Sequence, residues 1–136
     1  MKEMKLTGVF GVDYEKLGLV NLFGIEKAVI DDSGVFSLVM EVKEEHLNAY
    51  GVVHGASLYA LCDSAAGAFA AYKNIEGTGA DGSIHYYRPV FAGDTLYARV
   101  SERKQGKKLM ILFIELVNSG GKLIADGMFT VMKHTD

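Results

Sequence analysis

The 136-residue sequence has no tryptophan, one proline and one cysteine. With Cys62 as the only cysteine, no disulfide can form within the chain, and no histidine stands near it at the spacing of a zinc site. A formal charge of -3 argues against general nucleic-acid binding. The N-terminal segment has no apolar run of signal-peptide length, and no uncharged apolar run approaches the roughly 18 residues of a membrane span. We therefore expect no metal, nucleic-acid or membrane partner, and the cytosol as the default compartment.

What the chain does have is a long segment of apolar and small residues from Gly55 to Tyr72. Its length suits a helix and exceeds a strand, and its nearly continuous apolar character predicts a helix buried on nearly all sides. Between Glu45 and Lys73 the only full charge is Asp63. An unpaired carboxylate in apolar surroundings is costly, so we expect Asp63 to have a partner, a raised pKa or a catalytic role.

Helical spacing divides this segment into two faces. The neighbours of Asp63 on its own face are mostly very small, so the carboxylate should look onto open space. Gly55 begins the helix, which leaves its N–H free at the positive end of the helix dipole, where it suits a developing oxyanion. The face around Asp63 comprises Ala56, Tyr59, Ala60, Ala66 and Gly67, and the bulkier, sheet-facing stripe comprises Leu58, Leu61, Cys62, Ala65, Phe69 and Tyr72.

Alternating segments with turn residues between them predict β-strands on both sides of the helix. Hydrophobic residues make up 49% of the chain, enough for one domain over residues 1–136. The fold class is therefore α+β, with an antiparallel sheet of five or six strands wrapped around one long central helix. We expect strands at 25–30, 35–42, 83–88, 95–104, 109–118 and 123–133, a hairpin turn at 31–34, loops at 43–54 and 74–82, and a short helix at 13–17.

The run that contains Asn48, Gly51, His54-Gly55, Leu61 and Asp63 resembles the signature of the hotdog-fold acyl-CoA thioesterases, in the PaaI-type branch. The likeness covers about residues 22–132 and includes a Tyr-x-Arg-Pro strand end followed by Ala-Gly-Asp-Thr-Leu. It implies a hotdog fold and an acyl-CoA substrate. It also implies that Asp63 attacks or activates water, that the Gly55 amide polarises the thioester carbonyl, and that Asn48 helps to hold water or substrate.

This sequence departs from the family pattern at two positions. Ala56 stands where a second glycine is frequent, and Gly79 stands where many members have serine or threonine. Each site residue also has a plainer interpretation. Asp63 could be a structural acid paired with a buried arginine, and Asn48 could be a turn former. His54 is interpreted as an orienting group that holds the loop or touches the thioester, whereas the other three histidines are interpreted as structural.

Several further residues are candidates for substrate binding. Tyr59 and Ala56 could line an acyl pocket, although Tyr59 could equally be a packing residue. The phosphates of an acyl-CoA could be held by Arg88 or by basic residues around one hairpin, although such a cluster is usually solvated surface. The hairpin candidates are Arg103, Lys104, Lys107 and Lys108.

The sequence therefore predicts a cofactor-independent acyl-CoA thioesterase with Asp63 as nucleophile or general base. One alternative is a hotdog-fold hydratase or dehydratase, but that family carries a proline-rich loop before the helix and this chain has only Pro89. The other is a non-catalytic acyl-CoA-binding domain. We also expect the strand at 83–88 to pair with its own copy in a homodimer, which would bring His54 and Gly55 of one chain towards Asp63 of the other. A homotetramer would form through the outer sheet faces.

Overall fold

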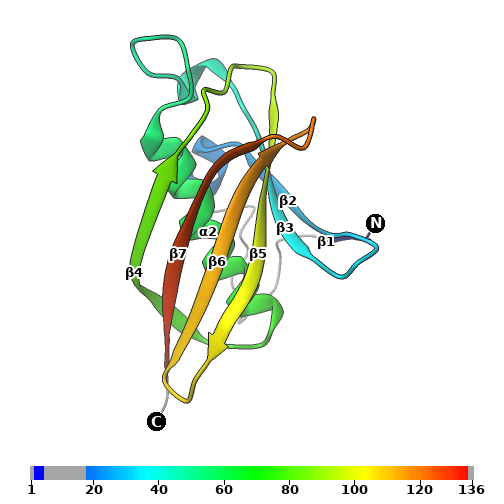
Figure 1. Ribbon diagram of the computed structural model, residues 1–136, viewed down its shortest axis with the longest axis vertical. Helices are drawn as coiled ribbons and strands as arrows, with labels where there is room; N and C mark the ends of the chain where they lie inside the picture. Colours follow the sequence, from blue (N-terminus) through cyan, green and yellow to red (C-terminus); the bar gives the residue numbers. More distant parts are fainter. Residues whose placement is uncertain (1, 5–17, 135–136) are drawn as a thin grey trace.

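The computed structural model describes residues 2–4 and 18–134, and its main feature is a curved antiparallel sheet wrapped around one long helix (Figure 1). Within these residues the sheet has seven strands, in the order β1-β2-β3-β5-β6-β7-β4, rather than the five or six predicted. The predicted helix at 13–17 lies outside the described residues. The elements are β1 (Lys2–Met4), α1 (Gly18–Leu22), β2 (Ile25–Ile30), β3 (Phe36–Glu41), the 3-10 turn η2 (Glu44–His46), α2 (Gly55–Tyr72), β4 (Gly77–Tyr86), β5 (Thr95–Gln105), β6 (Leu109–Asn118) and β7 (Leu123–Lys133).

Helix α2 has the predicted bounds and contacts β3, β4, β5, β6 and β7. Its sheet-facing stripe is buried as predicted from Leu58 to Phe69, with Leu61, Cys62 and Ala65 fully inaccessible. Tyr72, the last residue of the predicted stripe, is 36% exposed because it lies at the end of the helix. The prediction that α2 is buried on nearly all sides is wrong, because Asp63 and Gly67 are exposed. The helix therefore has one covered face and one open stripe.

The hairpin of β2 and β3 confirms the predicted turn at 31–34. Asp31 organises this turn, because its Oδ1 accepts hydrogen bonds from the Ser33 N–H at 2.9 Å, the Ser33 hydroxyl at 2.7 Å and the Val35 N–H at 3.0 Å. Gly34 has a φ of 86°, a left-handed conformation that glycine adopts without steric cost. The turn thus combines a side-chain acceptor with one permissive backbone position.

Strand β4 begins at Gly77, six residues before the predicted strand and inside the predicted loop at 74–82. The glycines of this segment allow close packing against neighbouring elements. A Cβ on Gly77 would lie 2.6 Å from Val131 Cγ1, and one on Gly82 would lie 2.5 Å from the Tyr59 hydroxyl oxygen. Backbone pairing with β7 and this close approach outweigh the low strand propensity of glycine.

The two ends of the sheet are β1 and β4. Strand β4 pairs with β7 on one side, and its other edge has no partner strand within the described residues. Strand β4 also contacts α2, which runs behind the strands in Figure 1. The structure therefore confirms that the strand preceding Pro89 is an edge strand, whereas its pairing with a second copy stays a prediction.

Candidate active site

The first turn of helix α2 has a side-chain cap, but one of its backbone N–H groups has no hydrogen-bond acceptor in the described residues. His54 has an extended backbone at the N-cap, and its Nδ1 accepts a hydrogen bond from the Ala56 N–H at 3.0 Å. The Gly55 N–H has no hydrogen-bond acceptor within the described residues. It is thus available at the positive end of an 18-residue helix, as predicted for an oxyanion donor.

Asn48 lies in the loop that precedes this helix. Its Oδ1 accepts from the Tyr50 N–H at 2.9 Å and from the Val52 N–H at 3.3 Å, while its backbone N–H donates to the Val52 carbonyl at 2.7 Å. The side-chain oxygen is therefore a turn former. No partner of the Nδ2 amide occurs in the described part of the chain, so this group remains free to donate.

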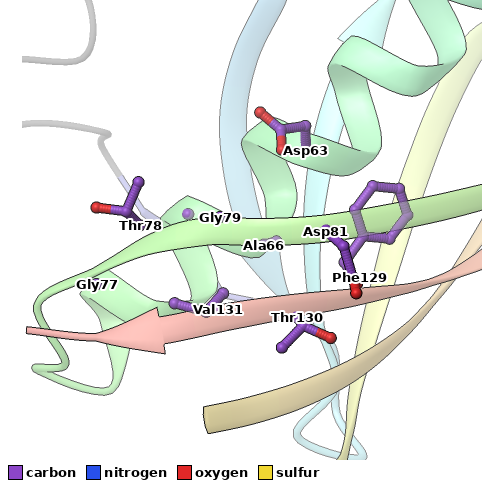
Figure 2. A pocket seen from close by; sticks show the side chains of 10 residues that line it. Asp63, Ala66, Gly77, Thr78, Gly79, Asp81, Phe129, Thr130 and Val131 are labelled. Atoms are coloured by element: carbon purple, nitrogen blue, oxygen red, sulfur yellow. The ribbon is translucent and has the colours of Figure 1, made fainter. Parts of the chain in front are cut away.

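Asp63 lies on the open stripe of α2, and its carboxylate has no hydrogen-bond or ion-pair partner within residues 2–4 and 18–134. It lines a cavity of about 230 Å³ between α2, β4 and β7. Figure 2 shows the Asp63 side chain projecting from α2 beside β4. A Cβ on Gly79 would lie 3.5 Å from Asp63 Oδ1, so the missing side chain at Gly79 leaves the carboxylate accessible.

Asn48 and Gly55 line a different cavity, of about 340 Å³. Asp63 follows Gly55 by eight residues, which is about 12 Å along an α-helix. Each of the two residues lines its own cavity and is absent from the lining of the other. The chain thus holds the carboxylate and the N–H donor in two separate cavities.

The candidate substrate-binding residues of the acyl pocket have different surroundings. Tyr59 packs with its ring centroid 5.4 Å from that of Phe129, so the structure favours the packing interpretation. Ala56 is exposed next to the capped helix start. Arg88 lines the cavity of Gly55 and donates from Nη1 to the Leu123 carbonyl at 2.7 Å, which leaves its other N–H groups available for an anion.

The basic hairpin lies far from the helix start. Figure 1 shows the turn between β5 and β6 at the opposite end of the molecule from the loop that leads into α2. The Arg103 guanidinium lies over the Phe113 ring, 4.7 Å from its centroid, and Lys104, Lys107 and Lys108 are exposed. The structure does not bring these residues together with the candidate catalytic groups of the same chain.

Two residues near the helix start make contacts that the sequence did not reveal. His46 is 2% exposed, with Nδ1 accepting from the Lys43 N–H at 2.9 Å and Nε2 donating to the Leu22 carbonyl at 2.6 Å. It is structural, as expected, but buried. Tyr86 donates from its hydroxyl to the Gly55 carbonyl at 2.9 Å. Its position in the Tyr-x-Arg-Pro strand end was the only signal in the sequence.

Three further properties of the described residues concern the cysteine, metal ligands and membrane spans. Burial strongly raises the pKa of the Cys62 thiol, with the nearby Asp63 contributing, so Cys62 stays protonated and acts as a core residue. Residues 2–4 and 18–134 contain no group of three or more His, Cys, Asp or Glu side chains placed to hold a metal ion. No α-helix in the described ranges is long and apolar enough to cross a membrane.

Residues 50–125, more than half of the chain, match the model of the thioesterase superfamily. The chain belongs to the thioesterase superfamily. The matched region includes the helix with Gly55 and Asp63, the edge strand β4 and most of the sheet. Asn48 lies just before it.

Individual members of the thioesterase superfamily match over most of their length. The acyl-coenzyme A thioesterase PaaI of Escherichia coli K12 is 36% identical over 115 residues, which are 82% of this chain and 79% of PaaI. Human acyl-coenzyme A thioesterase 13 is 36% identical over 70% of this chain and 69% of its own. The structure of the E. coli PaaI protein from the phenylacetic acid degradation operon superposes with a TM-score of 0.78 and 30% identity, covering 90% of this chain and 88% of that one. These matches confirm the resemblance to PaaI and the hotdog fold.

Proposed function

We propose that this chain hydrolyses an acyl-CoA thioester to a free acid and CoA, with Asp63 as nucleophile or general base. The observation that carries the proposal is an unpaired, exposed carboxylate on the same helix as a free N–H at its N-terminus. The relatives PaaI and acyl-coenzyme A thioesterase 13 carry this activity in their names, which supports the same substrate class here.

The two roles of Asp63 give the same overall reaction. As a base, Asp63 takes a proton from water while the water oxygen bonds to the thioester carbon, and the C–S bond then breaks to release CoA as its thiol. As a nucleophile, Asp63 forms a mixed anhydride and expels the CoA thiolate, and water then cleaves the anhydride. In both routes the carbonyl oxygen gains negative charge, and the Gly55 N–H stabilises it by donating a hydrogen bond to that oxygen. The Asn48 amide can hold the water or the carbonyl.

The proposed site is shared between two subunits. A carboxylate about 12 Å along the helix cannot reach a carbonyl held by the Gly55 N–H of the same chain. Pairing of two β4 edges about a two-fold axis would set the two α2 helices antiparallel, which moves Asp63 of one chain towards Gly55 of the other. The open stripe of α2 and the unpaired edge of β4 support this arrangement. A homotetramer would then form through the outer sheet faces, where Leu109, Met128 and Met132 are 39–50% exposed.

Release of CoA thiol from a panel of acyl-CoAs tests the proposed activity. We expect steady turnover by the wild-type protein and a loss in kcat on the order of a hundredfold or more in Asp63→Asn, as for a primary acid-base or nucleophilic group. Asp81→Asn is the matched control, because Asp81 lines the same cavity and has no proposed role. A hydratase or a non-catalytic binding domain would release no thiol, and near-normal turnover in folded Asp63→Asn would contradict the assignment.

Mixed dimers test the shared site. Asp63→Asn removes the carboxylate, and Gly55→Pro removes the N–H at the first helical position, which proline otherwise suits. Dimers with one copy of each variant should recover part of the activity, because one of their two sites contains both native groups. Verified mixed dimers without recovered activity, or an active monomer in ultracentrifugation, would exclude a site of this kind.

A further inference from the structure

Tyr86, the last residue of β4, lies directly against the first residue of α2. Its register partner on β7 is Ala125, a fully buried residue, so the Tyr86 side chain projects from the helix-facing side of the sheet. A Cβ on Gly55 would lie only 3.1–3.2 Å from Cζ, Cε2 and the hydroxyl oxygen of Tyr86. The ring therefore lies close against the Gly55 Cα, and a larger residue there would fit only if the ring moved by a few tenths of an ångström.

A chain of two hydrogen bonds leads from Tyr86 to His54 through one peptide unit. The Tyr86 hydroxyl donates to the Gly55 carbonyl oxygen at 2.9 Å. The same peptide unit carries the Ala56 N–H, which donates to His54 Nδ1 at 3.0 Å. Hydrogen bonds in a chain polarise one another, so a donor on the carbonyl strengthens the N–H as a donor.

This arrangement fixes the tautomer of the neutral His54 ring. A backbone N–H can only donate, so Nδ1 must be unprotonated, and the single proton of the neutral ring lies on Nε2. His54 is exposed at the helix start, and Nε2 lies on the opposite side of the ring from the capping bond. The ring therefore presents an N–H donor away from the helix.

We infer that Tyr86 is a positioning residue, which orients the Gly55 N–H by its ring and holds His54 as the Nε2–H tautomer by its hydroxyl. This inference rests on the proposed role of Gly55 as oxyanion donor. Two donors, the Gly55 N–H and the His54 Nε2–H, are then set by one side chain from the edge strand. Burial raises the pKa of Tyr86, so its hydroxyl keeps the donated proton to higher pH than an ordinary tyrosine.

Tyr86→Phe tests this role, because it keeps the ring on Gly55 and removes only the hydroxyl. Loss of a direct oxyanion donor costs about a hundredfold or more in kcat, so loss of an indirect support should cost about tenfold, with KM nearly unchanged. Ring 15N shifts of His54, assigned with a His54→Gln variant, should show protonation at Nε2 alone in the wild type and a mixture of tautomers in Tyr86→Phe.

Tyr87→Phe is the matched control. It makes the same change one residue later, where the hydroxyl donates to Asp126 and not to the Gly55 carbonyl. It should leave kcat and the His54 spectrum as in the wild type. The inference would be overturned if Tyr86→Phe left both kcat and the His54 shifts as in the wild type. A lower melting temperature of that variant, without a change in kcat or in the His54 shifts, would show that the Tyr86 hydroxyl serves stability alone. If the wild type released no CoA thiol, the proposed function would fail, whereas the 15N measurement would still decide whether Tyr86 sets the His54 tautomer.

Discussion

At the residue scale, Asn48 carries two chemically separate groups on one side chain. Its oxygen accepts from the Tyr50 and Val52 N–H groups and so shapes the loop before α2. Its amide nitrogen has no hydrogen-bond partner in the described residues. Asn48 also lines the cavity of Gly55. The turn-former and active-site interpretations of the sequence are therefore compatible, because they concern different atoms.

Substitution can separate these two groups. Asn48→Asp keeps an acceptor oxygen for the loop and removes the amide donor, whereas Asn48→Ala removes both. We expect Asn48→Asp to keep the wild-type melting temperature and to lose about tenfold in kcat, since orienting water or substrate is a partial contribution. Asn48→Ala should lose a similar factor and also melt at a lower temperature. Wild-type kcat in Asn48→Asp would reduce Asn48 to a loop residue.

At the element scale, β4 depends on glycines for two different reasons. Gly82 faces the Tyr59 hydroxyl and the Phe129 ring, at 2.5 Å and 2.6 Å from a hypothetical Cβ. Gly79 faces Asp63 Oδ1, at an ordinary contact distance of 3.5 Å. The first glycine permits packing of the strand on the helix, and the second leaves space in front of a carboxylate.

The substitutions Gly82→Ala and Gly79→Ala form a matched pair within this strand. Gly82→Ala should lower the free energy of unfolding by about 1–3 kcal/mol, the typical cost of overpacking. Gly79→Ala should change stability little but lower kcat, because its methyl group occupies the space next to Asp63. Chemical denaturation at one fixed protein concentration and CoA-release kinetics measure the two effects. Equal stability of the two variants would contradict the packing role of Gly82.

The β2–β3 turn is a second element whose stability can be tested through pH. Hydrogen bonds from Ser33 and Val35 lower the pKa of Asp31 below its ordinary value of 3.8. A lowered pKa in the folded state gives stability that is present above 3.8 and is lost as the pH falls through the folded-state pKa. Wild type should therefore melt at a higher temperature than Asp31→Asn at about pH 7, and the difference should shrink below about pH 3. A difference in melting temperature that did not change with pH would show that the charge of Asp31 does not contribute to stability.

At the scale of the whole molecule, the basic hairpin and the helix start occupy opposite ends of one subunit (Figure 1). The hairpin could contact a substrate held at Gly55 only if the hairpin came from another subunit. An antiparallel arrangement of two α2 helices would move this end of one chain towards the helix start of the other. The phosphate-binding prediction for the hairpin thus depends on the proposed dimer.

Neutralising the hairpin lysines tests this prediction. A triple change of Lys104, Lys107 and Lys108 to Gln should raise KM for acyl-CoA and leave kcat nearly unchanged, as expected for loss of uniform binding. Arg103→Gln is made separately, because its guanidinium also lies over Phe113. A short pantetheine thioester, which lacks the nucleotide phosphates, serves as the control substrate. Equal changes in KM on both substrates would identify the cluster as solvated surface.

The sequence was enough to predict the elements that are determined by residues close together in the chain. The bounds of α2 follow from a continuous apolar run, and the β2–β3 hairpin follows from alternation around a turn of Asp, Ser and Gly. The resemblance to the thioesterases rests on Asn48, His54-Gly55 and Asp63 at fixed spacing, and the comparisons confirm the family. These features depend on residues close together in the chain.

Only the tertiary structure decided which faces are covered and which groups meet. Helical spacing predicted open space in front of Asp63, but a small residue such as Gly67 fits a packed interface as well as an open surface, so composition could not show how far the exposed stripe extends. The glycine-rich start of β4 is a strand because β7 supplies its hydrogen bonds, and Tyr86 reaches Gly55 across 31 residues of sequence. The separation of Asp63 and Gly55 into two cavities likewise depends on what packs against each side of the helix, which no local pattern of residues contains.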